Sequence, residues 1–180
     1  MKMKIADIKL SSTAEVKGHF ADVIYFEEDG TKMDTDDIVN KLSTTSDVVV
    51  LTGEEPLLQD IPELSKLITR LKFKRKKVVV ETSMYQPLIV GLADKVLYTI
   101  KTFDIHTKDL LKLRDMSNVD FCIILGQQNF DMNGFKFAHS LIRKNIFHKF
   151  AMDIPGKFTT LYHFVKTIGK DFTVFRKIEL

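Results

Sequence analysis

Short apolar runs alternate with segments of helical periodicity along this chain. Strand-like runs lie at residues 5–10, 20–26, 48–51, 78–80, 96–100, 119–125, 147–154 and 172–178. Strands separated by helices of roughly ten residues predict βα units and a mostly parallel sheet. The pattern therefore predicts an α/β fold, either a partial (β/α) barrel or an open doubly wound sheet.

Helix signals fill the intervals between these strands. Asp34 or Thr35 can cap a helix that begins after them. Segment 61–71 carries one apolar stripe of helical spacing, formed by Leu64, Leu67, Ile68 and Leu71. Further helices are expected at 107–113, 135–144 and 159–168.

Composition limits the class of protein. A chain of 180 residues is most simply one domain over 1–180, and its net charge of +3 indicates neither nucleic acid nor membrane as a partner. The apolar runs are far shorter than the ~20 residues that span a bilayer, and the N-terminus lacks a signal-peptide core. The single cysteine fits a reducing compartment. A cytoplasmic protein is expected.

The most informative segment follows the apolar run 48–51. It reads Thr52-Gly53-Glu54-Glu55-Pro56-Leu57-Leu58 and then enters a helical pattern. This segment resembles the "TGGEPLL" motif of the radical S-adenosylmethionine (SAM) enzymes. The resemblance is closest to the branch that holds 7-carboxy-7-deazaguanine synthase and the organic-radical-activating enzymes.

Two later strand ends extend this resemblance. Glu81-Thr82-Ser83 is similar to the family's "ETNG" segment, and 93–101 is similar to its "AD-V--DIK" strand, with Lys101 as the lysine. The resemblance implies a partial barrel in which SAM docks at these strand ends. The cofactor-binding residues that it implies are Gly53, Glu54, Glu55, Pro56, Glu81, Thr82, Ser83 and Lys101.

The chain departs from the family at the position of the iron–sulfur cluster. Family members hold a [4Fe–4S] cluster with three cysteines, whereas this chain has only Cys122, within a predicted strand. Residues 27–33 form a short acidic turn where the cysteine loop belongs. Glu54 replaces a glycine and brings a negative charge to the methionine end of SAM. No cluster and only weak SAM binding are therefore expected.

Three interpretations follow from these departures. The first is a degenerate radical-SAM-fold protein that binds a small ligand, or that acts as a non-catalytic partner of an intact relative; a homo-oligomer is another expected assembly. The second is an enzyme of changed chemistry, with Glu54, Glu55 and Glu81 as acid, base or metal ligands. The third is a chance similarity in an ordinary doubly wound sheet.

Other candidate sites are weaker. The basic run at 72–77 is best explained by cations that offset the dipole at a helix C-terminus. The five histidines lack the spacing of metal ligands, and Cys122 fits the role of a small apolar residue. No metal site is expected from these residues.

Overall fold

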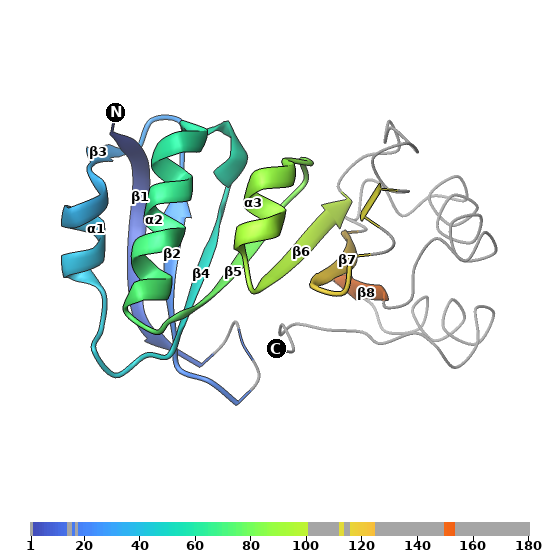
Figure 1. Cartoon of the computed structure of the whole chain (residues 1–180), viewed down its shortest axis with the longest axis horizontal. Coiled ribbons are helices and arrows are strands. Elements are labelled where there is room, and N and C mark those ends of the chain that lie inside the picture. Colours follow the sequence, from blue (N-terminus) through green and yellow to red (C-terminus); the bar gives the residue numbers. More distant parts are fainter. Residues whose placement is uncertain are drawn as a thin grey trace. The chain divides into compact units, whose positions relative to one another are not determined.

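The first part of the chain forms a twisted sheet whose strands at one edge are antiparallel (Figure 1). The computed structural model describes residues 2–13, 16, 18–100, 112–113, 116–124 and 150–153. Contacts divide the chain into two units, the first built around Met1–Leu97 and the second around Tyr98–Arg176. The expectation of a single domain over 1–180 stays a prediction.

The sheet of the first unit has the strand order β3-β1-β2-β4-β5-β6. Strand β1 pairs antiparallel with β2 and β3, while β2–β4 and β4–β5 are parallel pairs. In the second unit, β7 and β8 are also parallel. These pairings confirm the predicted α/β fold with a mostly parallel, open sheet. The strands are β1 Met3–Ser12, β2 Ala21–Phe26, β3 Thr31–Met33, β4 Val48–Gly53, β5 Lys77–Thr82, β6 Lys95–Ile100, β7 Val119–Ile124 and β8 Phe150–Asp153.

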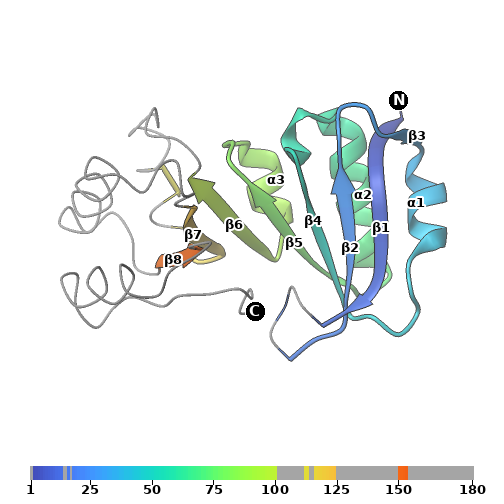
Figure 2. The same ribbon diagram turned by 180° about the vertical axis from the view of Figure 1, so that it is seen from behind.

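The helices of the first unit all lie on one face of its sheet. They are α1 Thr35–Lys41, α2 Ile61–Phe73 and α3 Pro87–Leu92, with a 3₁₀ turn, η1, at Pro56–Leu58. Figure 1 shows them in front of the strands, and Figure 2 shows the other face of the same strands without a described helix. The sheet is open, and the choice between a partial barrel and a doubly wound sheet stays a prediction.

Most predicted elements are present, with shifted ends. The side chain of Asp34 caps α1 by accepting from the Asp37 N–H (2.8 Å), and the predicted stripe of α2 is fully buried. Strand β3 and helix α3 were not predicted. The expected strand at 172–178 and the helices at 135–144 and 159–168 lie outside the described residues, as does almost all of 107–113.

Apolar packing differs between the two faces of the sheet. Helix α2 packs against β5 and its apolar stripe is fully buried, and burial of each member of the stripe contributes about 1.5–3 kcal/mol. The face without helices carries its own buried cluster. That cluster comprises Val16, Ala21, Val23, Val48, Val50 and Val79, with Tyr25 packed against it.

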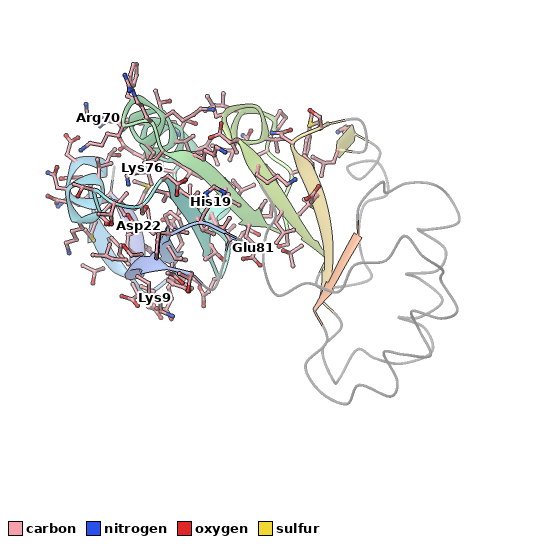
Figure 3. The ribbon with its side chains drawn as sticks, turned by 90° about the horizontal axis from the view of Figure 1, so that it is seen from below. Lys9, His19, Asp22, Arg70, Lys76 and Glu81 are labelled. Atoms are coloured by element: carbon pink, nitrogen blue, oxygen red, sulfur yellow. The ribbon has the colours of Figure 1, made fainter. Side chains whose placement is uncertain are left out.

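A buried ion pair links residues at the amino ends of β2 and β5. The fully buried Asp22 carboxylate accepts from the backbone N–H groups of Ser11 (2.9 Å) and Ser43 (2.8 Å). The Lys76 ammonium lies 3.9 Å from that carboxylate and donates to the carbonyls of Ser43 (2.6 Å) and Ser46 (2.7 Å) (Figure 3). This cluster fixes the loop before β4 to its neighbours.

None of the described helices combines the length and the apolar character that a bilayer crossing requires.

Candidate functional site at the strand ends

Gly53 ends β4 in a conformation that only glycine adopts without strain. Its φ is +115°, and a Cβ at this position would overlap the backbone of Phe26 at the end of β2. The next N–H, that of Glu54, donates to the Phe26 carbonyl (3.0 Å). Glycine is therefore needed here for the close approach of two strand ends.

Glu54 belongs to the same junction. Its carboxylate accepts from the backbone N–H of Glu28 (3.0 Å), which lies in the turn between β2 and β3. The side chain thus holds that turn against the end of β4. Sequence reasoning placed Glu54 as an added charge beside a ligand, but it did not foresee this contact.

Glu55 is buried and saturated with hydrogen bonds. One carboxylate oxygen accepts from the Leu57 N–H (3.2 Å) and from the Thr82 hydroxyl, and the other accepts from the N–H (2.8 Å) and hydroxyl (2.7 Å) of Ser83. Four donors fill the acceptor capacity of a carboxylate. Glu55 therefore joins the end of β4 to the end of β5, and Pro56 is buried beside it at the start of η1.

Glu81 forms a separate group with β4. The Thr52 hydroxyl donates to its carboxylate (2.8 Å) and is its only hydrogen-bond partner among the described residues. Side chains alternate along a strand, so Glu81 and the adjacent Thr82 point to opposite faces of β5. Glu81 bonds to Thr52, whereas Glu55 bonds to Thr82 and Ser83, and the expectation that Glu55 and Glu81 face one cavity stays a prediction. Lys101 lies outside the described residues.

A shallow depression of about 320 Å³ opens where β1, β2 and β4 meet. The Lys9 ammonium sits 4.8 Å from the centre of the Tyr25 ring, a cation–π distance. The acidic residues Asp7 of β1, Glu27 after β2 and Glu54 after β4 border the same depression. The lining includes Asp7, Lys9, Tyr25, Glu27, Gly53 and Glu54.

The sequence did not single out Asp7, Lys9 or Tyr25. Asp7 is the register partner of Tyr25 and Lys9 is the partner of Val23, so the antiparallel β1–β2 pair brings both charges to the strand-end side. The one local signal was the polar alternation within β1. This alternation indicated a half-exposed strand, but it did not indicate that the strand pairs with β2.

The cluster of the radical SAM family does not fit this strand end. Strand β2 runs through a tight turn, closed by the Gly30 N–H and the Glu27 carbonyl (3.1 Å), directly into β3. A Cβ at Gly30 would overlap the backbone of Ile5, so the turn is packed against β1. The turn holds no cysteine. Within the described residues, no group of three His, Cys, Asp or Glu side chains is placed to hold a metal ion.

Comparison with known proteins gives a likeness of fold alone. No family model matches the chain, and no curated protein matches it. Among solved structures, the chain is similar to SuiB of Streptococcus suis, which is a radical SAM enzyme. The structure of SuiB bound to its precursor peptide SuiA gives a TM-score of 0.52 at 12% identity. The match covers 86% of this chain and 38% of SuiB, so this chain spans well under half the length of that protein. SuiB bound to S-adenosylmethionine gives 0.46 and 11%, over 67% of this chain and 34% of SuiB.

Proposed function

We propose that this chain is a radical-SAM-fold protein without an iron–sulfur cluster, and that it binds a small zwitterionic ligand in the strand-end depression. The observation that carries the proposal is the mixture of charges around one open space. The Lys9 ammonium lies over the Tyr25 ring, and the carboxylates of Asp7, Glu27 and Glu54 border the same depression.

Charges of both signs suit a ligand of the amino-acid type. An ammonium group of the ligand can donate to the carboxylates of Asp7 and Glu27, and a ligand carboxylate can accept from Lys9, while the Glu54 carboxylate repels the ligand carboxylate. The methionyl end of SAM is a zwitterion of this type, which makes SAM the first probe.

A different observation favours a role as a non-catalytic partner of an intact relative. Thr82 and Ser83 both donate to the Glu55 carboxylate, so three of the residues that the family resemblance assigns to SAM are bonded within the chain. The changed-chemistry alternative loses Glu55 for the same reason, since a saturated carboxylate has no lone pair for a metal or a proton in transit. That alternative then rests on Glu54 and Glu81.

Calorimetry with SAM tests the small-ligand proposal. The wild type should bind weakly, because the Glu54 carboxylate repels the carboxylate of the ligand. Glu54→Gln keeps an acceptor for the Glu28 N–H and removes the charge, so it should tighten binding on the order of tenfold, equivalent to roughly 1.4 kcal/mol. Lys9→Met should weaken binding about tenfold, whereas the matched change Lys32→Met on β3 should leave it unchanged.

Other outcomes would redirect the proposal. Tight binding by the wild type that Glu54→Gln weakens would make Glu54 a ligand group and support the changed-chemistry alternative. Binding that Lys9→Met does not affect would place the ligand outside the depression. If no variant bound SAM, SAM would be excluded as the ligand and the role as a non-catalytic partner would be the better account.

A further inference from the structure

Strand β1 has an outer edge that is only partly paired. On that edge, β3 covers Met3–Ile5, whereas the rest of β1 pairs on its other side with β2. The burial of β1 changes at the same point, since the strand becomes largely exposed from Ala6 onward and Leu10 is 52% exposed. A stretch of about five residues, roughly 17 Å long, therefore presents a free strand edge to solvent.

A groove runs along this free edge. It has a volume of about 390 Å³ and is lined by residues 5–8 and Leu10 of β1, by Thr31 and Met33 of β3, and by Lys41 of α1. The Ile8 N–H donates to the carboxylate of the preceding residue, Asp7 (2.8 Å). Such a local bond is a substitute of the kind that an edge N–H adopts when no neighbouring strand accepts from it.

The sequence of this edge is complementary to itself in one antiparallel register. When two copies of β1 are aligned about Ile8, Asp7 of each copy lies opposite Lys9 of the other. In the same register Ala6 lies opposite Leu10, and Ile8 lies opposite Ile8. Opposite charges in directly facing cross-strand positions stabilise a pair of strands, and the symmetry supplies this charge pair twice.

The ends of the edge set the length of such a pair. Strand β3 occupies the edge up to Ile5, so a partner strand must leave β1 beyond its own Leu10. A register shift lies between Lys9 and Ser12, and Ser11 has a φ of +51°, so β1 departs from regular strand geometry there.

We propose that a second copy of this chain docks on the free edge, through antiparallel pairing of residues 6–10 of the two β1 strands about Ile8. The Ile8 N–H then exchanges its bond with Asp7 for a bond to the partner strand, and Asp7 pairs with the partner's Lys9. This contact is short, so the dimer forms weakly and depends on concentration. The contact needs no ligand, although Asp7 and Lys9 also line the depression of the proposed function, so dimerisation is measured without added ligand.

Charge reversal tests the register. In sedimentation equilibrium, Lys9→Glu and Asp7→Lys should each weaken dimerisation roughly tenfold or more, because each change places two like-charged pairs opposite one another. The double variant Asp7→Lys with Lys9→Glu should restore the dimer to within about threefold of the wild type. Lys74→Glu, the same charge change at an exposed position of the α2 C-terminus, should have no effect.

Hydrogen exchange provides a second readout on the full chain. Exchange of the Ile8 amide should slow as protein concentration rises, while exchange in α2 should not change. A wild type that stays monomeric over the accessible concentrations would overturn the proposal. A dimer that tolerates both single reversals, or that the double variant does not restore, would also overturn it, because the contact would then involve another surface.

Discussion

The two ends of the central strands bury a carboxylate in different ways. At the amino end, Asp22 receives two backbone N–H groups and faces the ammonium of Lys76. At the carboxyl end, Glu55 receives two backbone N–H groups and two hydroxyls, and no cation contacts it in the described part of the chain. The amino end is thus balanced in charge, whereas the carboxyl end holds its charge with neutral dipoles.

This difference separates an end that supports stability from an end suited to ligands. A paired buried charge resists change, because removal of either partner leaves the other unpaired in a low dielectric. The carboxyl end instead has its crosslink, Glu55, beside an open depression bordered by further carboxylates. In α/β folds, ligands bind at the carboxyl ends of strands, where loops vary without disturbing the sheet.

Loss of the Lys76 ammonium should have the largest effect. Lys76→Met leaves Asp22 buried without a cation and removes the donor to two carbonyls, so the free energy of unfolding should fall by about 3–5 kcal/mol. Urea unfolding measures the change. Lys74→Met, two residues away and exposed, should stay within about 0.5 kcal/mol of the wild type. Equal effects of the two changes would refute the structural role of the amino-end pair.

Substitution of Gly53 should be the next most damaging change. Gly53→Ala adds a Cβ against the Phe26 backbone at a positive φ, and a loss of about 2–4 kcal/mol is expected in thermal or urea unfolding. Gly91→Ala, in helix α3 with no atom within 4 Å of the added Cβ, should instead stabilise by about 0.5–1 kcal/mol. A tolerated alanine at residue 53 would contradict the close approach of β2 and β4.

The saturated carboxylate of Glu55 predicts a moderate effect. Glu55→Gln turns one acceptor oxygen into a donor that faces donors, so about 1–3 kcal/mol of stability should be lost. Glu54→Gln, at an exposed residue whose amide can still accept from the Glu28 N–H, should change stability by less than about 0.5 kcal/mol. Equal losses would show that the two glutamates do not differ as their surroundings indicate.

Acidification should produce the smallest effect. A hydrogen bond from His19 lowers the pKa of Asp47, and the hydrogen bond and charge of Arg70 lower the pKa of Asp36, both from an ordinary value of 3.8. A lowered folded-state pKa gives stability that is present above the ordinary value and is lost as pH falls through the folded value. Stability should therefore decline below about pH 4, and Asp47→Asn should flatten that decline only slightly, because both carboxylates are largely exposed.

Local patterns predicted much of the fold and little of its pairing. The stripe of α2 and the Asp34 cap depend on residues within two turns of helix, so spacing alone revealed them. The antiparallel position of β1 depends on Ile5 meeting Phe26, a contact that no local pattern encodes. Strand β3 has only three residues and helix α3 six, too few for a periodic signal.

The sequence predicted which residues lie at the strand ends of the candidate site, but not how their side chains are oriented or bonded. Thr52 to Pro56 and Glu81 to Ser83 lie at adjoining strand ends, as parallel pairing of β4 and β5 requires. Sequence could not show that Glu55 is bonded to Thr82 and Ser83, since hydrogen-bond partners nearly thirty residues apart depend on register. It also could not show that Glu81 turns to the other face.

Iron content after anaerobic reconstitution tests the central claim most directly, which is that this radical-SAM-type fold builds no [4Fe–4S] cluster. The purified full chain would be incubated with iron and sulfide, desalted, and assayed for both elements and for visible absorbance. We expect no stoichiometric cluster and an unchanged result for Cys122→Ser, because one chain offers one thiolate and a pair of chains only two, fewer than the three that the family uses. One [4Fe–4S] cluster per chain, with cleavage of SAM on reduction, would contradict the account.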